Sequence, residues 1–253
     1  MAFFTGNIQS EALAMQTALR VILPESGMGG KKILYLLHGL SDDASVWTRR
    51  TSVELFAEAH GYAVIMPEVH RSFYMDYARG GQYFTYVTKE LPALCEKLFG
   101  FRHTRETTFV AGLSMGGYGA LKCALRHPEQ YAACASFSGA VDLQRLVNSG
   151  EFEARLPEFE TLLGAGGRVK ESDDLMKLSV QTNSLAPDKK PRILTTCGLS
   201  DFLYKDNTAF RDHMRSLTFD YHYKEWSGDH SWPFWNTSIQ YALDFFDGKP
   251  LAD

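Results

Sequence analysis

The residues best placed to do chemistry in this sequence centre on Ser114. Gly112 and Gly116 flank this serine at two-residue spacing, and the apolar run 108–113 before it is typical of a buried strand. The small residues that follow, Met-Gly-Gly-Tyr-Gly-Ala, indicate the start of a tightly packed helix. This Gly-x-Ser-x-Gly pattern predicts a sharp strand-to-helix turn that holds a nucleophilic serine, with glycines where side chains would collide with the turn.

The serine needs partners, because a pattern of three common residues arises by chance in roughly one chain in ten of this length. A serine hydroxyl is a poor nucleophile at neutral pH and requires a histidine as general base. Among the eight histidines, His230 is the best candidate, since it lies in a Gly-Asp-His loop after the last predicted strand. His213 falls within a predicted helix and His222 within an alternating strand, so both are weaker candidates.

An acidic residue must hold that histidine in the right tautomer, and Asp201 is the preferred candidate. It follows a predicted strand, 192–197, in the way that the nucleophile follows its own strand. Asp229 is disfavoured because it adjoins the histidine. The remaining alternatives lie on a predicted helix, where a charged residue is usually solvated: Asp206 and Asp212. The chain order serine, aspartate, histidine is that of the α/β-hydrolases.

Acyl transfer also needs N–H donors for the oxyanion of the tetrahedral intermediate. In this fold one donor is the backbone N–H of the residue after the nucleophile, here Met115. The other comes from the first strand-to-helix loop, which reads His38-Gly39-Leu40. Leu40 is the predicted donor, Gly39 allows a close approach, and His38 is expected to order the loop rather than to act as a base.

Strands and helices that could position these residues alternate along most of the chain. Two extended segments, 2–8 and 15–23, predict an antiparallel opening to a sheet. Further strands are predicted over 32–37, 62–66, 108–113, 131–137, 192–197 and 219–226. Helical patterns cover 45–60, 83–99 (with Pro92 inside it), the segment from the serine turn to 127, 206–217 and 232–246.

This alternation predicts an α/β fold built on a mostly parallel, doubly wound sheet with helices on both faces. Ligands are then expected at the carboxyl ends of the strands, where Ser114 lies. The segment 141–186 breaks the pattern with charged helical pieces, and we interpret it as a small helical cap inserted over one end of the sheet. The whole chain, 1–253, is expected to form one domain.

The composition narrows the class of partner. A formal net charge of -4 offers no basic face for nucleic acid or anionic lipid, so neither is an expected partner. The four cysteines show no spacing typical of a disulfide framework or a zinc site, and no metal is expected. The sequence has no secretory leader pattern and no stretch of eighteen consecutive apolar residues, which favours a cytoplasmic protein.

Four blocks of sequence together resemble the tributyrin esterase group of the esterase D family, which includes S-formylglutathione hydrolases and feruloyl or acetyl-carbohydrate esterases. The blocks are Leu-Leu-His38-Gly-Leu, Gly-Leu-Ser114-Met-Gly-Gly-Tyr-Gly, Gly-Leu-Ser-Asp201-Phe-Leu-Tyr and Gly-Asp-His230-Ser-Trp-Pro-Phe-Trp. The likeness runs nearly from end to end. It implies an α/β-hydrolase fold, no cofactor, no metal and a homo-oligomer with the cap near the interface.

The resemblance implies a serine carboxylesterase that hydrolyses short-chain acyl esters, acetyl to butyryl, through an acyl-enzyme. It supports the five site residues given above, with Ser114, Asp201 and His230 as the catalytic triad and Leu40 and Met115 as backbone donors. The resemblance also extends the expected substrates to acetylated or feruloylated carbohydrates. The alternatives are a thioesterase of the S-formylglutathione hydrolase type, an acyltransferase to an alcohol acceptor and, with less support, a binding module without catalysis.

Aromatic residues in the predicted loops bear on the alcohol half of the substrate. Trp47, Tyr74 and Trp232 are the candidates for substrate binding, since an aromatic surface can stack on a sugar or a phenol, although such clusters are about as often core. One departure bears on the thioester alternative. Formylglutathione hydrolases usually carry a cysteine just after the His-Gly-Leu loop, whereas this chain has Ser41-Asp42-Asp43 there.

Overall fold

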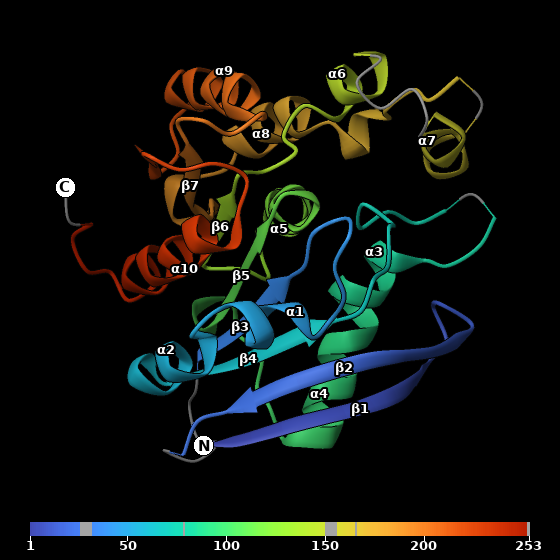
Figure 1. Ribbon diagram of the computed structural model, residues 1–253, viewed down its shortest axis with the longest axis vertical. Coiled ribbons are helices and arrows are strands. Elements are labelled where there is room, and N and C mark those ends of the chain that lie inside the picture. The colour runs from blue at the N-terminus through green and yellow to red at the C-terminus, as the bar shows by residue number, and fades with distance from the viewer. Residues whose placement is uncertain (26–31, 78, 150–155, 165, 252–253) are drawn as a thin grey trace.

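A central sheet organises the protein, whose computed structural model describes residues 1–25, 32–77, 79–149, 156–164 and 166–251 (Figure 1). The described strands form one eight-stranded sheet in the order β1-β2-β4-β3-β5-β6-β7-β8. β1 pairs with β2, and β2 with β4, in antiparallel fashion, and all other neighbours are parallel. The strands are β1 (Ala2–Ser10), β2 (Met15–Leu23), β3 (Lys32–Leu37), β4 (Tyr62–Pro67), β5 (Thr108–Leu113), β6 (Ala133–Phe137), β7 (Arg192–Gly198) and β8 (Tyr221–Trp226).

Helices cover both faces of the sheet, because the central strands are apolar on both sides. In β3, Tyr35 and Leu37 belong to one buried cluster, whereas Leu34 and Leu36 belong to the other. Figure 1 shows α2 and α10 on one side of the sheet and α4 and α5 on the other. The first face packs α1 (Val46–Arg50), α2 (Val53–His60) and α10 (Trp232–Phe246), and the second packs α4 (Leu91–Phe99), α5 (Met115–Arg126), α8 (Leu175–Asn183) and α9 (Tyr204–Arg215). The predicted doubly wound α/β fold is confirmed.

Two predicted helices are interrupted. The helix expected over 45–60 is split into α1 and α2 at Thr51 and Ser52. The helix expected over 83–99 begins as α3 (Tyr83–Thr85), continues as a π-helical segment (Tyr86–Glu90) and ends as α4. Pro92 accounts for the second interruption, since it has no N–H for the carbonyl of Thr88 and its ring would crowd that carbonyl in a regular α-helix.

The inserted segment between β6 and β7 contains three α-helices among its described residues, and residues 150–155 and 165 lie outside the described part. It contains α6 (Leu143–Asn148), α7 (Leu156–Leu163) and α8, which lie toward one end of the sheet in Figure 1. Asp173, which precedes α8, forms an ion pair with the buried Lys122 of α5, in which Oδ1 lies 2.5 Å from Nζ. Its main-chain oxygen also accepts the hydroxyl of Tyr118, at 2.7 Å. These contacts hold the insertion on the helix that follows Ser114.

The amino ends of two central strands are fastened by Asp247, which follows α10. Its carboxylate accepts from the ammonium of Lys32 at 2.5 Å, from Nδ1 of His60 at 2.8 Å and from the hydroxyl of Tyr62 at 3.0 Å. Burial would raise the pKa of Asp247, but the hydrogen bonds from Lys32 and His60 outweigh it and lower that pKa. Asp247 thus ties the C-terminal end of α10 to the edge of the sheet that lies opposite Ser114.

Two glycines let α5 begin directly over the sheet. A Cβ atom on Gly112 would lie 2.4 Å from the carbonyl oxygen of Gly116, and one on Gly116 would lie 2.4 Å from that of Leu37. These neighbours are backbone atoms, so a side chain at either position could be accommodated only by moving the strand or the helix.

We therefore predict that Gly112→Ala lowers the free energy of unfolding by about 2 kcal/mol or more, because the added methyl collides with backbone. Gly6→Ala is the matched control, since no atom lies within 4 Å of a Cβ at that position, and it should change stability by no more than about 0.5 kcal/mol. Urea denaturation of the two variants measures both values. Equal stabilities would contradict this account of the packing of α5.

Candidate active site

Ser114 occupies a turn between β5 and α5 that few residues other than glycine adopt. Its backbone angles are φ 53° and ψ −116°, a strained region for a residue with a side chain. Its N–H donates to the carbonyl of Phe137 at 2.9 Å, and its own carbonyl accepts the N–H of Ala140 at 3.1 Å. The end of β6 therefore holds the strained turn in place from the neighbouring strand.

His230 and Asp201 face each other at the same edge of the sheet. Nδ1 of His230 lies 2.9 Å from Oδ2 and 3.1 Å from Oδ1 of Asp201. The carboxylate is fully buried and also accepts the N–H of Leu203 at 2.8 Å, whereas the imidazole keeps 20% of its side chain exposed. With its Nδ1 proton donated to the aspartate, the imidazole has Nε2 free to accept a proton.

The loops that carry these two residues are fastened together by backbone contacts. The N–H of Ser200 donates to the carbonyl of Gly228 at 2.9 Å, and a Cβ atom on Gly198 would lie 2.5 Å from that same oxygen. The ring of His230 packs edge-on against the ring of Trp235, with 4.9 Å between their centroids, and against the ring of Phe202, with 4.5 Å between theirs. The orientation of the imidazole is therefore fixed from three sides.

A cavity of about 360 Å³ lies over the ends of the strands, and Ser114 and His230 both line it. Leu40 and Met115 line it as well. Met115 is the first residue of α5, so its N–H has no acceptor within the helix ladder. Ser114, His230, Leu40 and Met115 thus lie around one space, at the crevice between β3 and β5 where the strand order reverses.

The other candidate histidines and acids lie outside this cavity. Nε2 of His213 lies 2.7 Å from the hydroxyl of Ser179 in α8, and Nε2 of His222 lies 2.9 Å from its neighbour Asp220. The carboxylate of Asp206 is paired with the guanidinium of Arg145 in α6. Asp212 and Asp229 are exposed. The structure therefore brings Asp201, and none of the alternatives, to His230.

Comparisons with known proteins show which family the chain belongs to. The model of the Esterase family, described as "Putative esterase", matches residues 10–246. An acetyl esterase of Caldicellulosiruptor saccharolyticus is 28% identical over 97% of this chain and 98% of its own. Two solved structures from Staphylococcus aureus are similar over almost the whole chain. The serine hydrolase FphF is 32% identical with a TM-score of 0.86, and the match covers 100% of this chain and 99% of FphF. The S-formylglutathione hydrolase FrmB is 33% identical with a TM-score of 0.84, and the match covers 97% of this chain and 98% of FrmB.

The chain belongs to this esterase family. The resemblance to the esterase D family and the prediction of a carboxylic ester hydrolase are therefore confirmed, and the protein is a serine carboxylesterase of the α/β-hydrolase type. Among the helices of the described residues, none has both the length and the apolar character needed to cross a bilayer.

Of the three aromatic residues predicted to bind substrate in this esterase, the structure brings Trp232 alone to the cavity. Trp47 is buried and donates from its indole to the carbonyl of Leu37 at 3.1 Å, with its ring edge-on to Trp232 at 5.4 Å. Tyr74 is fully buried and donates its hydroxyl to the carbonyl of His38 at 2.9 Å. We therefore correct the assignment of Trp47 and Tyr74 as substrate-binding residues, because both side chains are buried beneath the residues of the site and do not line the cavity.

The esterase cavity also has wall residues that the catalytic motifs do not mark. Leu146 of α6 and Phe159 of α7 come from the insertion, Phe73 from the loop after β4, and Phe202 from the residue after Asp201. No motif marks the two residues of the insertion, since they belong to ordinary amphipathic helices. The position of Phe202 beside the proposed acid is a signal that could have identified this wall residue.

A second, more polar cavity of about 250 Å³ adjoins the first. The two cavities share Ser41, Asp42 and Trp232, and the second is completed by Asp43, Val46, Arg49 and Arg50. Burial raises the pKa of Asp42, which lies at the junction. One side of the esterase site is therefore apolar and the other carries acidic and basic side chains.

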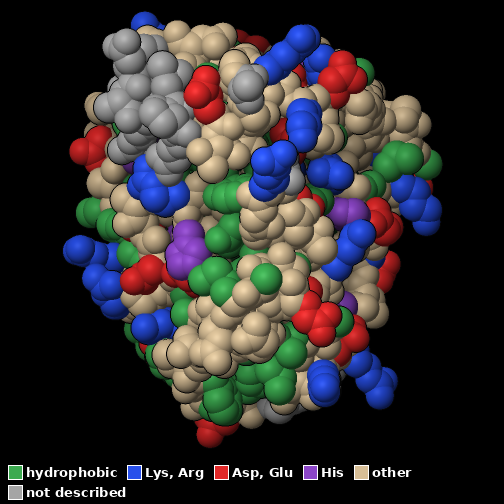
Figure 2. Space-filling model, turned by 90° about the vertical axis from the view of Figure 1, so that its right-hand side faces the viewer, with side chains coloured by type: hydrophobic (Ala, Val, Ile, Leu, Met, Phe, Trp, Pro, Cys, Tyr) green, Lys and Arg blue, Asp and Glu red, His purple; other side chains and the backbone are tan. Residues whose placement is uncertain are grey.

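One face of the esterase carries charges of both signs. On the described part of the face seen in Figure 2, Lys and Arg side chains are interspersed with Asp and Glu. Among the described residues, no group of three or more His, Cys, Asp and Glu side chains is placed to hold a metal ion.

Proposed function

We propose that Ser114 is the nucleophile of this esterase, His230 its general base and Asp201 the acid that orients the histidine. The observation that carries the proposal is the hydrogen bond between Asp201 and Nδ1 of His230, made beside a cavity that the imidazole and Ser114 share. A carboxylate on Nδ1 fixes the tautomer whose Nε2 can take the hydroxyl proton.

The reaction then proceeds in two halves. Nε2 of His230 takes the proton of Ser114 as Oγ attacks the ester carbonyl, and the imidazolium gives that proton to the departing alkoxide. The product alcohol leaves and the acyl group stays on Oγ as an ester. Water repeats the sequence, giving a proton to His230 as it attacks, and the carboxylic acid is released with the serine restored.

The oxyanion of each tetrahedral intermediate needs N–H donors, and we assign these to Met115 and Leu40. Support comes from their place in the cavity wall, on the helix start beside Ser114 and on the loop after β3. A donor fixed before the reaction stabilises charge that develops only in the transition state, and removal of one such donor typically costs about 10²–10³ in kcat.

For the substrate, we propose esters with a small acyl group, acetyl to butyryl, bound against the apolar wall. The acetyl esterase among the relatives supports this choice. We propose further that residues 1–253 form one domain in which 141–186 acts as a cap, since Leu146 and Phe159 of that segment line the cavity. The alcohol half then faces the polar cavity at Asp42, which suits hydroxylated alcohols such as sugars better than apolar ones.

Two other acyl transfers share these residues. FrmB is an S-formylglutathione hydrolase, so a thioester of glutathione is a second candidate substrate, although Ser41-Asp42-Asp43 stands here where a cysteine is usual in such enzymes. Transfer of the acyl group to an alcohol instead of water is the third. Product analysis with acetylated xylose, formylglutathione and a sugar acceptor separates the three.

We also propose a cytoplasmic location and a homo-oligomer. All four cysteines are buried and unpaired, as suits a reducing compartment. The family resemblance implies an interface near the cap, 141–186, and that placement is part of the proposal. Light scattering should give a dimer or larger assembly, and the mass of a single chain would refute the oligomer.

We predict that Ser114→Ala and His230→Ala reduce hydrolysis of p-nitrophenyl acetate to the background rate with the fold intact. Asp201→Asn should lower kcat by roughly 10⁴, because an asparagine favours the wrong tautomer of the histidine. His222→Ala is the matched control, since this histidine is exposed on β8 away from the cavity, and it should keep wild-type activity. An active Asp201→Asn enzyme would rule out the assignment of the acid.

The insertion generates a prediction about acyl length. Phe159 is 3% exposed and its ring lies 5.6 Å from that of Phe73 in the cavity wall, so Phe159→Ala should make room for a longer acyl chain. The ratio of kcat/KM for octanoyl over acetyl esters of p-nitrophenol should rise about tenfold or more.

The control for that variant is Leu162→Ala. Leu162 is buried on the same helix but does not line the cavity, so its truncation should reduce stability and leave the ratio unchanged. A ratio that moves equally in both variants would mean that the side chain of Phe159 does not itself limit the acyl group.

A further inference from the structure

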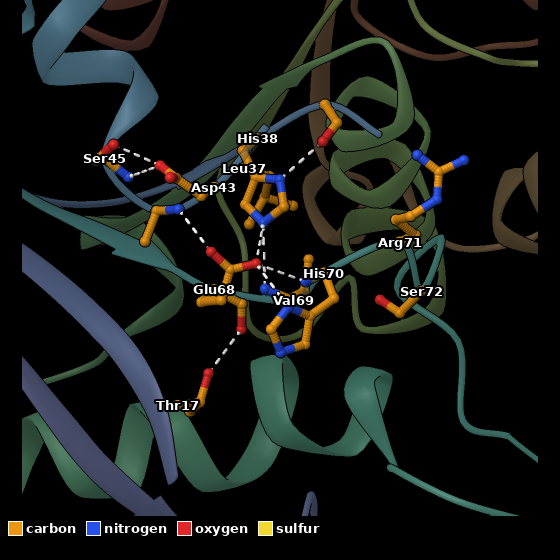
Figure 3. A network of polar contacts seen from close by, with 12 residues as sticks. Thr17, Leu37, His38, Asp43, Ser45, Glu68, Val69, His70, Arg71 and Ser72 are labelled. Atoms are coloured by element: carbon orange, nitrogen blue, oxygen red, sulfur yellow. Dashed lines mark hydrogen bonds and ion pairs between the residues drawn. The ribbon is translucent and has the colours of Figure 1, made fainter. Parts of the chain in front are cut away.

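One buried carboxylate outside the cavity binds the loop that carries Leu40. Glu68 directly follows β4, is 7% exposed, and accepts the N–H of Ala44 on Oε2 at 2.9 Å and the N–H of His70 on Oε1 at 2.7 Å. Figure 3 shows Glu68 between His38 and His70, with Thr17 donating to its main-chain oxygen at 3.2 Å. The carboxylate thus links the loop after β3 to the loop after β4.

His38 makes a second link between the same two loops. Its Nε2 accepts the N–H of Val69 at 3.1 Å and lies 3.3 Å from Oε1 of Glu68 (Figure 3). Because Nε2 accepts a hydrogen bond, the ring proton belongs on Nδ1, which donates to the carbonyl of Gly39 at 2.8 Å. The loop from His38 to Ala44 is therefore anchored at both ends on residues 68–70, and Leu40 lies between the anchors.

The charge of Glu68 is matched to this task. Burial would raise the pKa of its carboxyl group, but the N–H groups of Ala44 and His70, which donate to its two oxygens, lower that pKa. A lowered pKa favours the ionised form of this carboxyl group, and hydrogen bonds to an ionised acceptor are stronger than neutral ones.

The two proposed oxyanion donors are positioned by different parts of the chain. The N–H of Met115 is set by the turn between β5 and α5, whereas that of Leu40 is set by a loop whose fixed ends are His38 and Ala44. The donors must point at one oxygen to within a few tenths of an ångström to be effective. The position of the loop relative to the elbow is therefore a requirement of the reaction.

We propose that Glu68 is a positioning residue that sets the oxyanion loop, so that the N–H of Leu40 converges with that of Met115. Glu68 does not line the cavity and touches no reacting atom, so it acts through the loop. The inference rests on the proposed function, because it assumes that these two N–H groups form the oxyanion hole.

The test is Glu68→Gln, which keeps the size of the side chain but replaces one acceptor oxygen with an NH₂ group. One N–H, of Ala44 or His70, then loses its acceptor. The expected result with p-nitrophenyl acetate is a fall in kcat of about tenfold to a hundredfold at nearly unchanged KM, which is less than the loss of a whole donor. Binding of a trifluoromethyl ketone, which forms a tetrahedral oxyanion adduct, should weaken by a similar factor.

Asp247→Asn is the matched control for a merely structural role. Asp247 is also a largely buried carboxylate with three partners, but it lies at the opposite edge of the sheet. That variant should lose stability and keep wild-type kcat and ketone affinity per folded molecule. If Glu68→Gln does not fold, Glu68→Asp retains the charge with a shorter reach and should show a smaller loss of the same kind.

Wild-type kcat and ketone affinity in the folded Glu68 variant would overturn the inference, as would equal losses in the Glu68 and Asp247 variants. Failure of the proposed function looks different. In that case the wild-type enzyme itself would hydrolyse the ester no faster than Ser114→Ala.

Discussion

The strained turn at Ser114 is the constraint on which the rest of the structure depends. The chain must leave β5, reverse within one residue and start α5 directly over the sheet. This is possible only because backbone packs on backbone at Gly112 and Gly116, and because Phe137 and Ala140 hold the turn from the neighbouring strand. The strained backbone of Ser114 is stabilised by the packing of the surrounding sheet. The serine is thereby held in the wall of the cavity.

The parallel sheet brings the partners to that turn. Parallel strands all end at one edge, so Leu40 after β3, Asp201 after β7 and His230 after β8 meet there although nearly two hundred residues separate the first from the last. Gly198 packs closely against the backbone of Gly228, which brings the two loops together. Oδ2 of Asp201 and Nδ1 of His230 then lie 2.9 Å apart, within hydrogen-bond distance. The topology of the sheet places these residues near one another, and close packing of the backbone sets the distances between them.

Features set by periodicity and chain order could be predicted from the sequence. The apolar runs of β3 and β5 predict buried strands, and the order of Ser114, Asp201 and His230 predicts a shared sheet edge. Features set by packing could not. Trp47 and Tyr74 have the chemistry of binding residues, yet their burial depends on helices and loops far away in the sequence. Glu68 carries no motif, and its role depends on loop contacts that only the folded structure shows.

The central claim is that Ser114 is activated by His230 at this turn, and covalent trapping tests it most directly. Diethyl p-nitrophenyl phosphate transfers its phosphoryl group to an activated serine, and the adduct can be located by mass spectrometry of peptides. The account predicts one adduct per chain, on Ser114, formed rapidly in the wild type and lost in His230→Ala. An adduct on another residue, or equally fast labelling of Ser114 without His230, would contradict it.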